Sequence, residues 1–346
     1  MKIDLFCHIL PPRYFARMTA MSTRGAYLQK RVRGIPAMVD LDERFRMMDL
    51  FGDYVQVLSL AAPPIEALGS PGQASELARL ANDTMAEIAV RHPDRFPGFV
   101  ASVPMNDPDA TVREIDRAIG DLGASGIQIF TNVNGRPLDD TELTPIFQRM
   151  AEIGRPVWLH PTRTGSFTDY ATEDKSKFEL WWTFGWPYET SVAMARLVFA
   201  GYFDRWPALQ IITHHMGGMI PYFAGRIGPG LDQLGARTDD EDLTVYLKRL
   251  KKRPFDYFKM FFADTALFGA RDAMECGLKF FGIDQVVFAS DFPFDPEKGT
   301  FNIRETIKDI DGLPISAAER QQIYEGNARK LLRLEPVPSI PSVPSR

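Results

Sequence analysis

The sequence predicts a single-domain (β/α)8 barrel over residues 1–334, of the metallo-dependent hydrolase type. Two observations support this prediction. Short apolar runs alternate with amphipathic stretches, and the apolar runs number eight. Alternation of this kind is typical of repeated strand-helix units around a parallel sheet. The chain has 346 residues, and a barrel of eight units needs about 250 plus insertions. An open doubly wound sheet is less favoured, because no glycine-rich phosphate turn follows the first run.

The eight predicted strands are, in order, KIDLFCH (2–8), YVQVLSL (54–60), PGFVASV (97–103), GIQIF (126–130), PVWLH (156–160), ALQIITH (208–214), YFKMFFA (257–263) and DQVVFAS (284–290). Helical periodicity lies between them and is clearest at 74–91, 108–122, 141–153, 188–204, 266–278 and 316–333. Asp, Ser or Thr often stands where it can cap a first helical turn.

Two connections are too long for simple turns, residues 9–43 after the first strand and 161–187 after the fifth. We expect both to lie above the barrel mouth as lids. The second carries Trp181, Trp182 and Trp186, which suit a cover over a planar or unsaturated substrate. Packing within the loop, or at a subunit interface, is an equally good interpretation of these aromatics. The proline-rich tail at 335–346 cannot form a helix, and we expect a flexible end or an arm on a partner subunit.

Composition limits the partners. The chain has 45 acidic and 40 basic side chains, a net charge of -5 and no lysine- or arginine-rich stripe, so nucleic acid is not expected. There is no secretion-signal pattern and no apolar run long enough to cross a membrane. Cys7 and Cys276, the two cysteines, lie far apart in the sequence. We expect a cytoplasmic protein without membrane contacts.

Polar residues gather at the predicted strand ends. His8, His160 and Asp291 end three separate strands, and these ends converge on one face of a barrel. Imidazoles and a carboxylate suit Zn²⁺ or a similar divalent ion, and three protein ligands leave a position for substrate. Of the adjacent pair His214 and His215, we expect only one to reach the cavity.

The chain resembles the amidohydrolase-superfamily decarboxylases that are similar to amino-carboxymuconate-semialdehyde decarboxylase and to resorcylate-type aromatic-acid decarboxylases. The resemblance covers about residues 1–334. It rests on six segments in order: KIDLFCHILPPRYF, MDLFGDYVQVLSL, GIQIFTNVNGRPLDD, WLHP at 158–161, HHMGGMIPYFAGRI at 214–227 and FASDFPFD at 288–295.

The resemblance implies that His8, His160 and Asp291 bind the metal. It implies that His215 activates a metal-bound water or serves as acid/base, and His215 and Asp291 are the predicted catalytic residues. It also implies that Arg226 binds the substrate carboxylate, in some members across a subunit interface, and that Arg44 is a second such arginine. A homodimer or higher homo-oligomer is therefore expected. Surface salt bridges are the alternative roles for both arginines.

The chain departs from the family at the first ligand, where the family has Asp-x-His-x-His or Glu-x-His and this chain has Asp4, Phe6 and His8. Phenylalanine cannot bind a metal, and strand alternation turns Cys7 to the opposite face. Three ligands still suffice for an ion, which we expect to be Zn, with Mn, Co or Fe possible, held more weakly than in the family. Phe6 is then expected to contact substrate, and Asp4 to support the strand.

The expected function is metal-dependent non-oxidative decarboxylation of an aromatic or unsaturated carboxylic acid. One alternative is a hydrolase or hydratase of the same superfamily acting on a lactone, amide or double bond, since one barrel site supports both reactions. The other is a non-catalytic barrel that binds an acidic ligand or serves as a regulatory subunit.

Overall fold

The computed structural model describes residues 1–21 and 34–334. Eight parallel strands form one sheet in the order β1-β2-β3-β4-β7-β8-β9-β10. They are β1 (Lys2–Ile9), β2 (Tyr54–Leu60), β3 (Gly98–Ser102), β4 (Gly126–Phe130), β7 (Val157–His160), β8 (Ile211–Thr213), β9 (Phe262–Asp264) and β10 (Val286–Val287). A separate two-stranded hairpin joins β5 (Asn132–Val133) and β6 (Arg136–Pro137).

The sheet curves into a nearly closed barrel because the chain after β10 returns to β1. The amide of Leu5 donates to the carbonyl of Phe288 at 3.0 Å, and the amide of His8 donates to Phe292 at 2.7 Å. Cys7 and Phe292 also form a parallel bridge. This closure brings the residues that follow the last strand, including Asp291, against the end of β1. The predicted barrel is confirmed.

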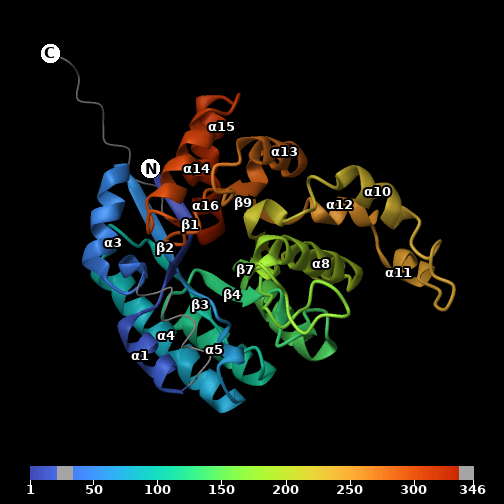
Figure 1. The fold of residues 1–346 in the computed structure, drawn as a ribbon, viewed down its shortest axis with the longest axis horizontal. Coiled ribbons are helices and arrows are strands. Elements are labelled where there is room, and N and C mark those ends of the chain that lie inside the picture. The colour runs from blue at the N-terminus through green and yellow to red at the C-terminus, as the bar shows by residue number, and fades with distance from the viewer. Residues whose placement is uncertain (22–33, 335–346) are drawn as a thin grey trace.

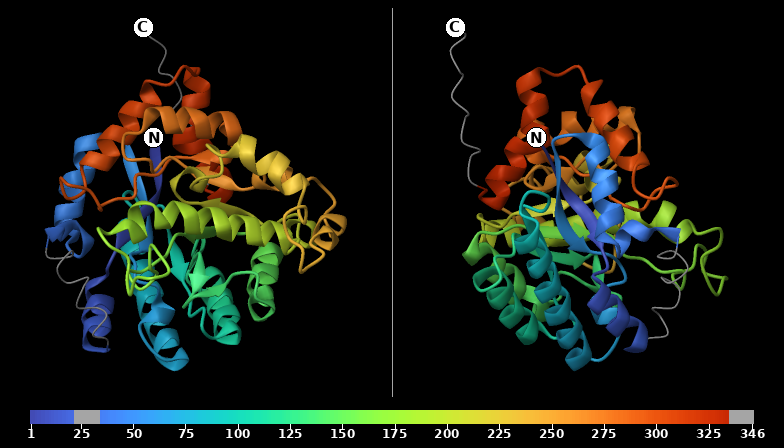
Figure 2. Two further views of the ribbon diagram at one scale, coloured as in Figure 1. Left: turned by 45° about the vertical axis from the view of Figure 1, so that its right-hand side comes forward. Right: turned by 90° about the vertical axis from the view of Figure 1, so that its left-hand side faces the viewer.

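Helices surround the strands on the outside (Figure 1). They are α1 (Pro12–Met21), α3 (Leu41–Met48), α4 (Pro71–Arg91), α5 (Pro108–Gly120), α6 (Thr144–Ile153), α7 (Leu180–Thr183), α8 (Gly185–Phe199), α9 (Tyr202–Arg205), α10 (Ala224–Asp232), α11 (Thr244–Arg249), α12 (Pro254–Phe258), α13 (Arg271–Phe281), α14 (Phe301–Asp311), α15 (Ala317–Gln321) and α16 (Asn327–Leu332). Local capping explains several starts: the Asp107 carboxylate accepts from the amide of Ala110 at the start of α5, and Ser316 with Glu319 forms a capping box on α15. In Figure 1 and in the left view of Figure 2, the segment with α10 and α11 projects from the rest of the molecule.

The barrel interior is filled by side chains. Trp158 of β7 is fully buried, and its indole N–H donates to the carbonyl of Leu5 on β1 at 2.9 Å. Because these strands are not neighbours, the contact crosses the barrel. Gly126 of β4 makes room for this ring, since a Cβ there would lie 2.7 Å from Trp158 and 2.1 Å from the carbonyl oxygen of Pro156. The interior packing therefore fixes β7, and with it the position of His160.

Several predicted elements had wrong boundaries, including the following two. The run 257–263 was expected to be one strand, yet Pro254 starts α12, which continues to Phe258, and β9 covers only Phe262–Asp264. An apolar run by itself does not distinguish a buried helix from a buried strand. The helix expected at 266–278 begins at Arg271, so the preceding residues form a loop at the barrel mouth. The proline-rich tail expected at 335–346 lies outside the described residues.

No helix in the described part of the chain is both long and apolar enough to span a bilayer.

Candidate metal centre and active site

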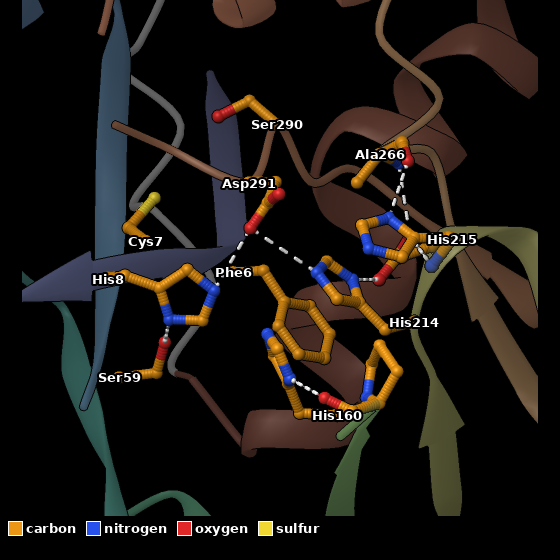
Figure 3. Close-up of polar contacts among 12 residues, drawn as sticks. Phe6, Cys7, His8, Ser59, His160, His214, His215, Ala266, Ser290 and Asp291 are labelled. Carbon is orange, nitrogen blue, oxygen red and sulfur yellow. Dashed lines mark hydrogen bonds and ion pairs between the residues drawn. The ribbon is translucent and has the colours of Figure 1, made fainter. Parts of the chain in front are cut away.

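Four buried side chains converge at the carboxyl ends of the strands: His8, His160, His214 and Asp291 (Figure 3). Each offers one potential ligand atom, and these atoms all lie within 4.8 Å of one another. His8 and His160 belong to the ends of β1 and β7, His214 directly follows β8, and Asp291 lies four residues after the end of β10. The structure thus brings together the three predicted ligands and adds His214.

Each imidazole is oriented by a second group. His8 Nδ1 lies 3.2 Å from the hydroxyl of Ser59, and His160 Nδ1 donates to the carbonyl of Pro161 at 2.7 Å. His214 Nδ1 contacts the buried carboxylate of Asp264. Groups of this kind fix which ring nitrogen carries the proton and hold the other toward a metal. For His160 the bond leaves the lone pair on Nε2.

The donor set fits a divalent metal. His8 Nε2 lies 3.0 Å from Asp291 Oδ1, yet it forms no hydrogen bond with any described residue. Two such atoms this close without a hydrogen bond are expected where both face a common ion. His214 Nε2 lies 3.4 Å from the same Asp291 oxygen. Three imidazoles and one carboxylate suit Zn²⁺, Mn²⁺ or Fe²⁺.

The charges of the cluster also suit a cation. Burial raises the pKa of Asp291, but the imidazoles of His214 and His8 outweigh it and hold this pKa well below its usual range. Burial, assisted by His214 and His8, keeps the pKa of His160 well below its usual value, so the ring is neutral at physiological pH. For His214 burial lowers the pKa, whereas Asp264 and Asp291 together raise it to about 9. A metal at Nε2 of His214 would therefore displace a proton.

His215 lies beside this cluster. Its ring stacks on His214 with centroids 3.7 Å apart, and its Nδ1 donates to the carbonyl of Ala266 at 2.8 Å. Its backbone amide donates to Asp264 Oδ1 at 2.9 Å. Burial and the neighbouring His214 lower the pKa of His215 to about 4. The arrangement leaves Nε2 of His215 as the nitrogen able to accept a proton.

The sequence predicted that only one of the two adjacent histidines reaches the cavity, and it did not include His214 among the ligands. In the structure both rings lie at the site, because the chain turns sharply after β8. His215 and Met216 have positive φ angles of 51° and 52°, which strand alternation does not anticipate. The adjacent His-His pair itself was the one signal in the sequence that pointed to His214.

Phe6 is fully buried and packs flat on His214, with ring centroids 4.0 Å apart and an interplanar angle of 13°. An aromatic ring thus fills the place at which the family has its first ligand and supports the added imidazole. Asp4 accepts hydrogen bonds from the hydroxyls of Tyr54, at 2.6 Å, and Ser290, in agreement with the supporting role expected for it.

The aromatic residues of 161–187 come close to the centre through Trp186. Its ring contacts the ring of His160 at a centroid distance of 5.6 Å, and Trp181 and Trp182 pack against Trp186 at 5.9 and 6.4 Å. Two aromatics that the sequence did not single out also border the ligands: Phe130 contacts His160 at 5.1 Å and Phe294 contacts His8 at 5.5 Å.

The two arginines lie in different settings. Arg44 is fully buried, and its guanidinium donates to Gln56 Oε1 at 2.8 Å and to the carbonyl of His8 at 2.8 Å. These contacts tie α3 to the end of β1 and so position His8; a contact with substrate stays a prediction. Arg226 is exposed on the projecting helix α10, apart from the cluster of ligands.

Comparison with known proteins agrees with this geometry. A family model described as amidohydrolase matches residues 3–334. Gamma-resorcylate decarboxylase of Rhizobium radiobacter is 33% identical over 310 residues, covering 85% of this chain and 87% of the relative. The 2-amino-3-carboxymuconate-6-semialdehyde decarboxylase of Dictyostelium discoideum is 29% identical, covering 97% and 92%.

Among solved structures, dihydroxybenzoic acid decarboxylase from a Polaromonas species, with bound manganese and the inhibitor 2-nitroresorcinol, superimposes with a TM-score of 0.77 at 28% identity. The match covers 97% of this chain and 98% of that one. The resemblance expected from the six segments is thereby confirmed. With its barrel, its strand-end ligands and these relatives, the chain belongs to the amidohydrolase family.

Proposed function

We propose that this protein is a metal-dependent decarboxylase that removes CO2 non-oxidatively from an aromatic or unsaturated carboxylic acid. The observation that carries the proposal is the buried cluster of His8, His160, His214 and Asp291 with His215 stacked beside it. The relatives with this fold are named as decarboxylases of such acids, and the neighbour from Polaromonas binds manganese and an aromatic inhibitor.

A divalent ion at the cluster would supply a Lewis acid that polarises a substrate oxygen. Zinc suits the three imidazoles and the carboxylate best, and manganese is the competing choice because a solved neighbour carries it. Metal analysis of protein purified without chelators distinguishes the two ions.

The acid/base work falls to His215. Because Nδ1 donates to Ala266, Nε2 is free to take up a proton and to deliver it to the ring or diene carbon that bears the carboxylate. The carbon-carbon bond to the carboxylate then breaks and CO2 leaves. The electron pair of the broken bond returns to the ring or diene and restores the conjugated system. The low pKa of about 4 makes protonated His215 a strong acid toward carbon. Trp186, packed on His160, excludes water from this step.

We propose that Arg226 serves the carboxylate in the site of a second copy, which would make the protein a homodimer or higher homo-oligomer. This agrees with its exposure on α10, in the segment that projects from the barrel. A cytoplasmic location stays a prediction.

The test is incubation of metal-loaded enzyme with hydroxybenzoates, picolinic-type precursors and muconate semialdehydes, with CO2 release and product mass as readouts. We expect CO2 from at least one compound and a large loss of rate in His215→Asn, with bound metal retained. Uptake of water without CO2 would identify a hydrolase or hydratase instead. Absence of any reaction from a chain that holds metal would contradict the proposal and favour a ligand-binding role.

A further inference from the structure

A second polar feature lies next to the metal centre, on the side of strands β2, β3 and β4. A narrow cavity, with about 10 Å³ of space for the centre of a water-sized group, is lined by residues that end or follow these strands, including Leu60, Glu66, Ser102, Gln128 and Phe130. In a barrel, such residues face the mouth where substrates bind. None of them belongs to the metal cluster.

Two side-chain oxygens at this cavity have no partner within the described residues. Glu66 and Gln128 are 3% and 4% exposed, and Oε1 of each is buried without a hydrogen bond. Gln128 Nε2 donates to the carbonyl of Leu60 at 2.9 Å. This bond orients the side-chain amide and leaves Oε1 of Gln128 as the atom without a hydrogen bond. The backbone carbonyl of Glu66 accepts from the side chain of Asn134 at 2.9 Å, which holds the short helix η3 (Ile65–Ala67) in place.

Leaving such oxygens unpaired is costly, because buried polar groups nearly always have partners. No cation of the described residues pairs with Glu66, and burial raises its pKa to about 8. Tyr14 has a buried hydroxyl without a hydrogen bond as well, and the charge of Glu66 adds to the burial that raises the pKa of this tyrosine. The cavity therefore holds two unpaired oxygens, Oε1 of Glu66 and Oε1 of Gln128, and little charge at neutral pH, where Glu66 is protonated.

The cavity adjoins the metal centre through Phe130, which is one of its lining residues and whose ring contacts the ring of His160. On the β2 side, Leu60 directly follows Ser59, the residue that contacts His8 Nδ1. A ring bound at the metal could therefore extend a substituent past Phe130 toward Glu66 and Gln128.

We propose that Glu66 and Gln128 form a subsite that binds a hydrogen-bond-donating substituent, a hydroxyl or an amino group, on the substrate. This inference rests on the proposed function, since it concerns the substrate of the same site. Two acceptor oxygens match an O–H or N–H donor.

Binding is measured by calorimetry on the full-length, metal-loaded chain. The probes are the ortho, meta and para benzenediols and aminophenols, each compared with the methoxyphenol that keeps one hydroxyl and loses the second donor. For the isomer that reaches the subsite, we expect the diol or aminophenol to bind about tenfold or more tightly than its methoxy counterpart. Glu66→Leu and Gln128→Leu should each remove most of this preference, and Glu66→Gln, which keeps Oε1, should retain it.

Asp309→Asn is the matched control. Asp309 is also a buried acid, 6% exposed, with one oxygen lacking a hydrogen bond, but it lies on α14 on the outside of the barrel. It should keep the preference unchanged. If Glu66→Leu fails to fold, Gln128→Leu carries the test.

A wild-type chain without any preference, or a preference that survives in Gln128→Leu and in a folded Glu66→Leu, would overturn the subsite and leave the cavity as a site for water. The CO2 assay is independent of this binding measurement. Selective binding without CO2 release would refute the decarboxylase proposal alone, and CO2 release without selective binding would refute the subsite alone.

Discussion

The ring of Phe6 lies parallel to the imidazole of His214, with centroids 4.0 Å apart. Phe6 stands where the resemblance places the family's first ligand, and His214 brings an additional candidate ligand to the cluster. On its other face His214 stacks on His215, so that a layer of three rings connects β1 to the turn after β8. The packing of these rings and the retention of metal are therefore linked.

Phe6→Ala should destabilise the protein by about 3–5 kcal/mol, because the ring is fully buried and its loss leaves a cavity beside His214. Chemical denaturation measures this free energy of unfolding. The matched control is Phe178→Ala, at a position 88% exposed, which should change stability by no more than about 0.5 kcal/mol. Equal stability of the two variants would contradict the packing described for Phe6.

His214→Ala should weaken divalent metal binding by about a hundredfold or more, because it removes one of four converging donors. Metal content after dialysis and a competitive chelator titration both report the affinity. His92→Ala, at the end of α4 and outside the cluster, should bind metal as the wild-type chain does. Unchanged affinity in His214→Ala would leave only His8, His160 and Asp291 as ligands.

Asp264→Asn tests the group behind His214. The carboxylate contacts His214 Nδ1 through Oδ2, and its Oδ1 accepts from the amides of His215 and Ala266 at 2.9 and 3.0 Å. Replacing it by the neutral amide should lower metal affinity by about 10–100-fold without removing a ligand. The same substitution at the exposed Asp256 should have no effect on affinity. An affinity loss as large as that of His214→Ala would point instead to a collapse of the whole turn.

Glu66 should make stability depend on pH. Its pKa rises from 4.5 in the unfolded chain to about 8 in the folded one, so between these values the folded state holds a proton that the unfolded state has lost. Stability is then fully present below pH 4.5 and falls as the pH rises toward 8. At about 1.4 kcal/mol per unit, the total loss is on the order of 5 kcal/mol.

Glu66→Gln should abolish this dependence. The variant and the wild-type chain should unfold at similar denaturant concentrations near pH 5, and the variant should be more stable near pH 9. Glu66 is buried without a cationic partner, so we expect its ionisation in the folded state to cost stability. Parallel pH profiles for the two proteins would contradict this expectation.

The sequence by itself predicted the barrel and three of the four candidate metal ligands. Local apolar runs specify strands, and parallel strands that close into a barrel must gather their carboxyl ends on one face. His8, His160 and Asp291 therefore meet wherever the rest of the chain lies. The sequence also indicated a missing ligand, because Phe6 stands where the family has a metal-binding residue.

Only the tertiary structure showed which residue joins the cluster in place of the ligand missing at Phe6. His214 continues the extended backbone of β8, and Asp264 on the neighbouring strand holds its ring, whereas the positive φ angles that begin at His215 turn the second ring toward the site. Glu66 and Gln128 come together only when β2 and β4 take their places in the sheet. Contacts of this kind join residues far apart in the chain, and no local pattern of side chains encodes them.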